Sequence, residues 1–250
     1  MVAVLRVPYH LDEYLPDLDT LLEGGQEIAP VLPAGDVWDR LAVLYSAVGQ
    51  AVAGSTRRGS VPVVVSGDCT TSLGIVTGLQ RAGVDPAIVW FDAHGDVQTL
   101  ETTASGYLGG LPLRLLMGYR PELIGTRLGL RAIPEDRVLL AGARDLDPPE
   151  ASYLAAARVH RAGVTTLTPA GLPGGPLYVH VDVDVIDPGE LPALRYPARG
   201  GVSSGQLTAA LRMILITGRV AAVGLACTWH PGHPVPAGLR RGLASALGPS

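Results

Sequence analysis

The chain has 250 residues, 47% of them hydrophobic, and carries a formal net charge of −4 at pH 7. This balance provides no broad basic surface for nucleic acid or an anionic membrane, and no apolar run approaches the roughly 20 residues that span a bilayer. All 19 basic residues are arginines, which excludes a lysine nucleophile, a pyridoxal-phosphate Schiff base and a Walker A lysine.

The chain is expected to form a single domain over residues 1–250, because no composition break or linker divides it. Two cysteines, Cys69 and Cys227, do not make a disulfide framework at this length, so a reducing compartment is expected. The first residues are typical of a strand and not of a signal segment. We therefore expect a cytoplasmic protein.

Strands and helices alternate along the predicted secondary structure. Hydrophobic periodicity predicts, in chain order, a strand at 2–7, a helix at 36–53, a strand at 61–65, a helix at 71–82 and a strand at 87–91. A glycine-rich loop at 103–112 leads to a helix at 113–117, a strand at 138–141, a helix at 149–161, strands at 164–167 and 177–184, a helix at 203–216, a strand at 220–226 and a helix at 237–247. This order predicts an α/β fold with a mostly parallel sheet, in which ligand groups gather where the strands end.

Three candidate metal ligands follow the strand at 87–91. In an extended chain Asp92, His94 and Asp96 fall on one face, because side chains alternate with a period of two. One imidazole and two carboxylates form a mostly oxygen-donor set, which suits a divalent ion such as Mn²⁺. The alternative is a solvated loop, because aspartate and glycine are common loop residues.

Two more acidic residues interrupt the apolar strand at 177–184, namely Asp182 and Asp184. Unpaired buried carboxylates are very unfavourable, so they require cations nearby. Together with the group at 92–96 they are sufficient to bridge two metals, an arrangement that activates a water for hydrolysis. The sequence therefore predicts a two-metal hydrolytic site at the strand ends.

Two further residues have both a structural and a functional interpretation. Cys69 follows the strand at 61–65 in a position like that of Asp92, but a buried inert thiol is an equally good interpretation. Asp147 can cap the helix at 149–161 or bind a ligand.

The motifs Asp-Ala-His-Gly-Asp at 92–96 and Asp-Val-Asp-Val-Ile-Asp-Pro at 182–188 resemble those of the arginase and agmatinase (ureohydrolase) superfamily, and the resemblance covers about residues 61–231. It implies a three-layer α/β/α fold around a mostly parallel sheet. It also implies two Mn²⁺ per chain and the hydrolysis of guanidino groups by a hydroxide that bridges the metals.

The resemblance assigns the ligands by position. One Mn²⁺ would be bound by Cys69, Asp92, Asp96 and Asp182. The other would be bound by Asp92, His94, Asp182 and Asp184. Catalytic roles fall to His94 and Asp96.

Three positions depart from the family pattern. Cys69 stands where the family usually has histidine, and its thiolate weakens the preference for Mn²⁺ and makes the site sensitive to oxidation. Gly109 stands where the family loop Ser-Gly-Asn-Leu-His-Gly has its proton-shuttle histidine, a loss that can lower the rate about 10²- to 10⁴-fold. Thr228 replaces a glutamate that pairs with the guanidinium, and a hydroxyl cannot neutralise a buried cation.

The pattern that binds an amino acid, by contrast, resembles that of arginases. Ser105 falls where they hold the substrate carboxylate, Gln98 stands where they usually have asparagine, and Asp147 matches the acid that takes the α-amino group. Decarboxylated substrates such as agmatine have no use for this set. The resemblance therefore implies a small guanidino amino acid as the ligand, with no nucleic-acid or membrane partner, and leaves monomer or homo-oligomer open.

Hydroxylation of a guanidine lowers its basicity, so a hydroxylated substrate is neutral near pH 7 and needs no glutamate. The resemblance thus implies a hydrolase of N(ω)-hydroxy-L-arginine that forms hydroxyurea and L-ornithine, as in antibiotic biosynthesis. The alternatives are an arginase- or agmatinase-type enzyme in which His230 or His10 supplies the proton, a catalytically silent metal-binding relative, and, more distantly, a zinc deacylase of similar fold.

Overall fold

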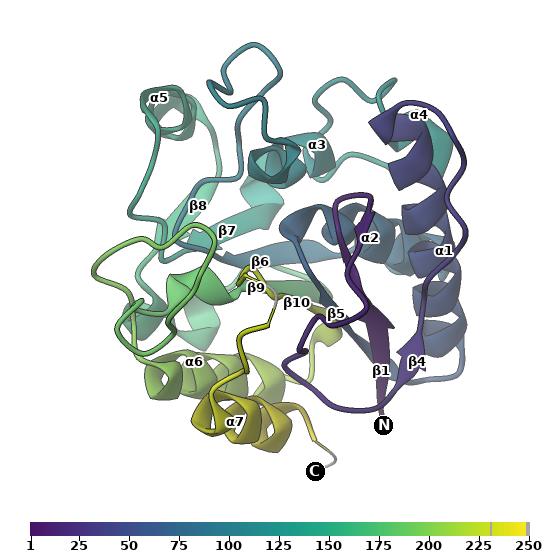
Figure 1. Ribbon diagram of the computed structural model, residues 1–250. Helices are drawn as coiled ribbons and strands as arrows, with labels where there is room; N and C mark the ends of the chain where they lie inside the picture. The colour runs from purple at the N-terminus through teal and green to yellow at the C-terminus, as the bar shows by residue number, and fades with distance from the viewer. Residues whose placement is uncertain (231, 249–250) are drawn as a thin grey trace.

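A parallel sheet forms the centre of the computed structural model, which describes residues 1–230 and 232–248. Its eight strands follow the order β4-β1-β5-β10-β9-β6-β7-β8, and every pairing within it is parallel (Figure 1). Pro231, which ends the predicted resemblance, and residues 249–250 of the predicted domain lie outside the described residues.

The elements have the following bounds. The strands of the central sheet are β1 (Val2–Val7), β4 (Gln26–Glu27), β5 (Val61–Ser66), β6 (Ala87–Phe91), β7 (Val138–Ala141), β8 (His160–Ala162), β9 (Leu177–Asp182) and β10 (Val220–Ala226). A separate antiparallel pair comprises β2 (Tyr9–His10) and β3 (Glu13–Tyr14). The helices are α1 (Val37–Arg57), α2 (Ser72–Arg81), α3 (Pro112–Leu116), α4 (Gly125–Leu128), α5 (Pro148–Ala156), α6 (Ser204–Ile216) and α7 (Ala237–Leu247).

Helices cover both faces of the sheet. Helices α1 and α2 lie on one side and α6 and α7 on the other (Figure 1). Each side has its own buried apolar cluster, because successive strand residues point to opposite faces: Ile88 and Trp90 of β6 belong to one cluster, and Val89 and Phe91 to the other. The predicted three-layer α/β/α architecture is confirmed.

The contact between α1 and α2 depends on glycine. A Cβ atom on Gly78 would lie 2.7 Å from the Gly49 carbonyl oxygen and 2.7 Å from Val52 Cβ. A Cβ on Gly74 would lie 2.8 Å from the Tyr45 carbonyl oxygen. The two helix backbones can therefore approach more closely than larger side chains would allow, and this contact fixes α2, whose first turn follows Cys69.

The region after α5 differs from the prediction. The predicted helix at 149–161 ends at Ala156, and the residues predicted as a strand at 164–167 begin instead with a 3₁₀ turn over Val164–Thr166. The strand here is β8, which pairs with β7 at the edge of the sheet. Local periodicity could not show this, because the pairing joins residues that are far apart in the sequence.

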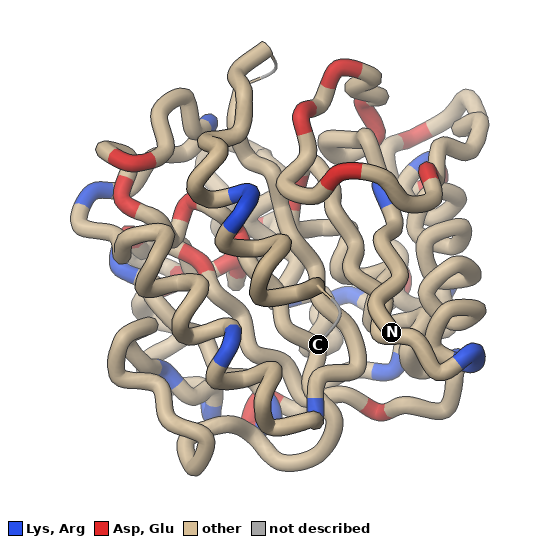
Figure 2. The backbone as a smooth tube through the Cα atoms, turned by 90° about the horizontal axis from the view of Figure 1, so that it is seen from below, with Lys and Arg blue, Asp and Glu red and all other residues tan. Residues whose placement is uncertain are grey.

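Both signs of charge occur along the backbone. Figure 2 shows several acidic positions close together in loops in the upper part of the view, whereas the arginine positions are more spread out. Among the described residues, no helix combines the length and the hydrophobicity needed to cross a membrane.

Candidate functional site

A cavity of about 260 Å³ opens where β5, β6, β9 and β10 end. Its wall contains every residue predicted for the site except Asp92, which is bonded to His94 at its floor. Parallel strands on either side of a reversal in strand order create such a crevice at their carboxyl ends. The fold thus brings the predicted site residues together from five separate stretches of the chain.

The loop after β6 is a tight turn and not the extended segment predicted for 92–96. Strand β6 ends at Phe91, and the Asp92 carboxylate accepts hydrogen bonds from Trp90 Nε1 (3.1 Å) and from the His94 backbone N–H (2.7 Å). Asp96 has φ of 53°, in the left-handed region that aspartate tolerates better than most residues. The turn, and not strand alternation, brings the three side chains to the site.

The second acidic segment also leaves its strand earlier than predicted. Strand β9 ends at Asp182, whose carboxylate accepts the Asp184 N–H (2.9 Å) at the start of a 3₁₀ turn over Val183–Val185. Asp184 accepts the Ala93 N–H (3.0 Å), so the turn is tied directly to the loop after β6. His94 Nδ1 lies 3.0 Å from the Asp184 carboxylate and 3.5 Å from that of Asp92.

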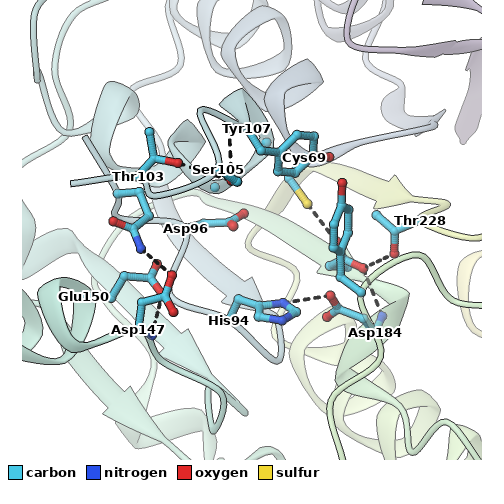
Figure 3. A pocket seen from close by; sticks show the side chains of 15 residues that line it. Cys69, His94, Asp96, Thr103, Ser105, Tyr107, Asp147, Glu150, Asp184 and Thr228 are labelled. Atoms are coloured by element: carbon cyan, nitrogen blue, oxygen red, sulfur yellow. Dashed lines mark hydrogen bonds and ion pairs between the residues drawn. The ribbon is translucent and has the colours of Figure 1, made fainter. Parts of the chain in front are cut away.

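Asp182 connects two of the positions that depart from the family pattern. The Cys69 thiol donates to one of its oxygens (2.9 Å), and the Thr228 hydroxyl donates to the other (2.7 Å). Cys69 and Thr228 therefore lie on two sides of the same carboxylate, with the His94–Asp184 pair nearby (Figure 3). Both are buried, Cys69 at the start of a 3₁₀ turn after β5 and Thr228 just beyond β10.

The acidic cluster lacks enough positive charge of its own. Burial and neighbouring carboxylates raise the pKa of Asp96 and of Asp182 well above the usual aspartate value. Burial and the Asp92 charge raise the pKa of Asp184 to about 6. Among the described residues, Asp96 Oδ2 is buried without a hydrogen-bond partner. A buried carboxylate without enough hydrogen bonds is stabilised by a bound cation, so this cluster is suited to metal ions.

His94 and Cys69 respond to this negative surrounding in different ways. Burial opposes the charge on His94, but its hydrogen bonds to Asp184 and Asp92 outweigh burial and raise its pKa to about 12. Burial and the charge on Asp182 raise the pKa of the Cys69 thiol. Bound cations reverse this effect, because a metal holds both a thiolate and a neutral imidazole as ligands.

Two groups of side chains have the spacing that one metal ion requires. One ligand atom each from Asp92, His94 and Asp184 lie within 4.8 Å of one another. A second group, with the same spacing, consists of Cys69, Asp92 and His180. The two groups share Asp92 and contain four of the six predicted ligands, whereas Asp96 and Asp182 belong to neither group. His180 was not among the predicted ligands.

The other end of the cavity contains the residues predicted to bind an amino acid. Gln98 Nε2 donates to the Asp147 carboxylate (2.8 Å), and Ser105 Oγ accepts the Tyr107 N–H (3.2 Å). Asp147 is also the N-cap residue of α5, and its backbone N–H donates to Glu150 Oε2 (3.3 Å). The helix-capping interpretation of Asp147 is confirmed, and the same residue lines the cavity.

Tyr107 occupies the space beside Gly109. A Cβ atom on Gly109 would overlap the Tyr107 ring, which lies in the upper part of the cavity near Cys69 (Figure 3). The Tyr107 hydroxyl lies 3.2 Å from His10 Nε2, and His10 Nδ1 lies 3.0 Å from the Gly67 carbonyl oxygen. The sequence analysis missed Tyr107, although a tyrosine where the family loop has asparagine was a visible signal.

The two histidines considered as proton sources differ in position. His10 is buried and stacks on Tyr107, with ring centroids 5.8 Å apart. His230 is exposed, its backbone N–H donates to the Ala193 carbonyl oxygen (2.9 Å), and it does not line the cavity. His10 thus contacts Tyr107, a residue of the cavity wall.

Comparisons with known proteins agree with this geometry. A model of the family described as Arginase family matches residues 11–227. The arginase of Eremothecium gossypii is 30% identical over 192 residues, which cover 70% of this chain and 48% of that protein. The N(omega)-hydroxy-L-arginine amidinohydrolase of Streptomyces lavendulae is 32% identical over 177 residues, covering 67% of this chain and 61% of that protein. The matched segments thus span about half to three fifths of these curated relatives.

Solved structures have the same fold. Entamoeba histolytica arginase, in a crystal structure with L-ornithine, superposes with a TM-score of 0.82 at 16% identity, covering 98% of this chain and 97% of that one. At this identity the likeness establishes the fold alone.

Proposed function

Because the chain belongs to the arginase family, we propose that it is a two-metal amidinohydrolase that converts N(ω)-hydroxy-L-arginine and water to hydroxyurea and L-ornithine. The observation that carries the choice of substrate is the Thr228 hydroxyl, which donates to Asp182 (2.7 Å) where a glutamate would pair with a cationic guanidinium. A role in antibiotic biosynthesis is part of the proposal.

The proposed metal ligands are the residues that the resemblance assigned. One ion would be held by Cys69, Asp92, Asp96 and Asp182. The other would be held by Asp92, His94, Asp182 and Asp184. The unpartnered Asp96 oxygen and the raised pKa values of the buried carboxylates support this assignment. When bound, the metal pair supplies a water that is acidic enough to act as a nucleophile near neutral pH.

The amino-acid end of the cavity positions the substrate. Asp147, held by Gln98 (2.8 Å), offers a carboxylate to the α-ammonium group, and the Ser105 hydroxyl can donate to the α-carboxylate. These contacts direct the side chain of an arginine-like substrate toward the acidic cluster across the cavity. An analogue that lacks the carboxylate loses one of these anchors.

Thr228 selects a neutral group by hydrogen bonding. Since its hydroxyl proton is used in the bond to Asp182, the oxygen faces the cavity as an acceptor. An N–H or O–H of a hydroxyguanidine can donate to it. A guanidinium ion would instead place a full positive charge there without a dedicated counter-ion, beside cations already bound to the acids.

Asp96 is the proposed proton carrier. Its Oδ2 atom has no hydrogen-bond partner among the described residues and the side chain lines the cavity. It can therefore hold the proton released from the attacking water and pass it to the nitrogen of the departing ornithine. His94 would act beside it as a ligand of the ion that Asp184 also binds, since its Nδ1 lies 3.0 Å from the Asp184 carboxylate.

The test compares L-ornithine release from N(ω)-hydroxy-L-arginine and from L-arginine by Mn²⁺-loaded protein. We expect kcat/KM to favour the hydroxylated substrate by at least about 100-fold, the size of effect expected for one mispaired buried charge. The variant Thr228→Glu should shift the preference toward arginine, whereas Thr126→Glu, at an exposed threonine, should not.

L-Arginine is the second candidate substrate, because the relatives include arginases. Equal turnover of the two substrates by the wild-type chain would contradict the proposed specificity while leaving the hydrolase in place. Absence of turnover of either substrate, with two metal ions bound, would instead support a silent metal-binding relative.

A further inference from the structure

We propose that His180 is an additional metal ligand, so that the ion bound by Cys69 and Asp92 also receives an imidazole nitrogen. This inference rests on the metal pair of the proposed function. It adds a residue that neither the motifs nor the resemblance assigned to the site. The resulting sulfur, nitrogen and oxygen donor set favours Zn²⁺ or Co²⁺ over Mn²⁺ at this position.

The location of His180 places it beneath the acidic cluster. It lies on β9 two residues before Asp182, so both side chains point to the same face of the sheet. The residue is only 2% exposed, and its ring stacks on Trp90 with centroids 3.7 Å apart. The ring is therefore held in one orientation under the loop that begins at Asp92.

The two ring nitrogens of His180 have different surroundings. Nδ1 lies 3.1 Å from Ser72 Oγ and 3.2 Å from the Tyr178 hydroxyl, which are themselves 2.7 Å apart. Nε2, in contrast, is buried with no hydrogen-bond partner among the described residues. A nitrogen held on one side by a hydroxyl, with the other free, is the arrangement found for metal-binding histidines.

The distances fit a shared ion. A ring nitrogen of His180, the Cys69 sulfur and an Asp92 oxygen lie within 4.8 Å of one another. Zinc bonds to nitrogen, oxygen and sulfur are about 2.0 to 2.3 Å long, which places neighbouring ligands of a tetrahedral ion roughly 3.3 to 3.8 Å apart. A small contraction around a bound ion brings all three atoms into range.

The inference also accounts for the cysteine. A cysteine side chain is shorter than the histidine that the family pattern has at position 69, and the imidazole of His180 comes from β9, which is separated from β5 by β10 in the sheet. The chain thus retains an imidazole at this metal although the sequence position has changed. The competing explanation is that Nε2–H donates a hydrogen bond to the Cys69 thiolate and makes no bond to metal.

The experiment counts imidazole ligands by X-ray absorption spectroscopy on protein loaded with two Zn²⁺ or two Co²⁺ per chain. With His94 and His180 both bound, we expect two imidazoles per two ions in the wild type. One imidazole in the wild type would overturn the proposal by itself, even if no variant of this buried residue folds.

The variant is His180→Phe, which preserves the stacking on Trp90 and removes both nitrogens. We expect the imidazole count to fall to one and one of the two Zn²⁺ dissociation constants, measured against a chelator, to rise by more than about 100-fold, above the range typical of residues that only support a ligand. His160→Phe, at an exposed histidine of β8, is the control and should change neither value.

A weaker affinity with an unchanged imidazole count would show that His180 acts through the Cys69 thiolate, and this result would overturn the ligand assignment. Hydroxyarginine turnover with Mn²⁺ is measured separately. Its absence in a wild-type chain that contains two imidazole-bound ions would contradict the proposed function and leave the role of His180 intact.

Discussion

Tyr107 and Gly109 form a complementary pair at one wall of the cavity. The ring of Tyr107 fills the space that any side chain at 109 would enter. Its hydroxyl contacts His10 Nε2 at 3.2 Å. Since His10 Nδ1–H donates to the Gly67 carbonyl, Nε2 is left as the acceptor of the tyrosine proton. The tyrosine is therefore held in the wall by a second buried side chain.

This pairing predicts that a larger side chain at position 109 destabilises the protein unless Tyr107 is replaced as well. Gly109→His alone should expel the Tyr107 ring and lower the free energy of unfolding by about 1 to 3 kcal/mol, as for other overpacked sites. Adding Tyr107→Asn gives residues 105–110 the family sequence Ser-Gly-Asn-Leu-His-Gly and should recover most of the lost stability. Urea unfolding of the two variants and of Tyr107→Asn alone measures the coupling, and additive effects would argue against the steric explanation.

At the scale of elements, helix α2 connects the packing of the fold to the site. It follows the turn that contains Cys69, and it packs on α1 through Gly74 and Gly78. Its first residue, Ser72, also contacts His180 Nδ1 at 3.1 Å. Helix α2 therefore connects the packing on α1 to Cys69 in the cavity wall and to His180.

Two helical glycines test this arrangement as a matched pair. Gly78→Ala should lower the free energy of unfolding by about 1 to 3 kcal/mol, because the new methyl group meets the Gly49 carbonyl and Val52 at 2.7 Å. Gly238→Ala in α7, where the new Cβ has no neighbour within 4 Å among the described residues, should instead stabilise by about 0.5 kcal/mol through helix propensity. Thermal or urea unfolding distinguishes them, and equal effects would refute the close-packing argument.

At the scale of the whole molecule, the strand order decides where the charges meet. Strand β6 follows β5 along the chain, but in the sheet β10 and β9 lie between them. This arrangement gathers the loops after all four strands at one end of the sheet. It also concentrates buried carboxylates that the protein's own cations do not neutralise, since His94 is the basic side chain paired with them.

The charge imbalance predicts an unusual pH dependence for the metal-free protein. The pKa of Asp184 is raised from 3.8 to about 6, and those of Asp96 and Asp182 are raised as well. The pKa of Asp92 is lowered, because the hydrogen bonds and charge of His94 outweigh burial, and this one carboxyl acts in the opposite direction. With three carboxyls raised against one lowered, the folded chain binds more protons than the unfolded chain in this range. Its free energy of unfolding should therefore fall as pH rises from 4 to 7, by about 1 to 3 kcal/mol. His94, raised from 6.5 to about 12, acts in the same direction above pH 6.5.

The measurement is urea unfolding in the presence of a chelator at several pH values. Metal-loaded protein should show the opposite trend, because protons compete with metal for the same ligands and metal binding strengthens as pH rises. A variant that combines Asp92→Asn, Asp96→Asn, Asp182→Asn and Asp184→Asn should lose most of the pH dependence of its unfolding free energy, both without and with metal. A metal-free chain that gains stability with pH would contradict the assigned charge state of the cluster.

Local patterns in the chain were sufficient for much of the fold and for the inventory of the site. Strands 2–7, 87–91, 138–141 and 220–226 were predicted with their observed bounds, because these buried runs carry a strong apolar signal. Asp92 and Asp96 were recognised because they form a group of metal ligands with His94 within five residues, and Asp182 and Asp184 because carboxylates are out of place in an apolar strand. The match of the family model to residues 11–227 confirms the resemblance.

What local patterns could not provide was the contact between distant segments. His180 looked like one polar residue in a strand, and its free nitrogen became apparent only beside Cys69 and Asp92. Tyr107 looked like a loop residue until its ring was found in the space beside Gly109. The edge strand β8 likewise depends on pairing with β7 and not on its own composition.

The sequence by itself determined the α/β class and the chemical types available to the site, because periodicity and residue chemistry are properties of the chain. Only the tertiary structure decided how these groups meet. It shows that Asp182 accepts hydrogen bonds from both Cys69 and Thr228, and that Gln98 donates to Asp147. It also shows that turns, and not the alternation of side chains along a strand, direct the acidic side chains into the site. The physical reason is that such contacts depend on strand order and packing between residues far apart in the chain, to which no local pattern refers.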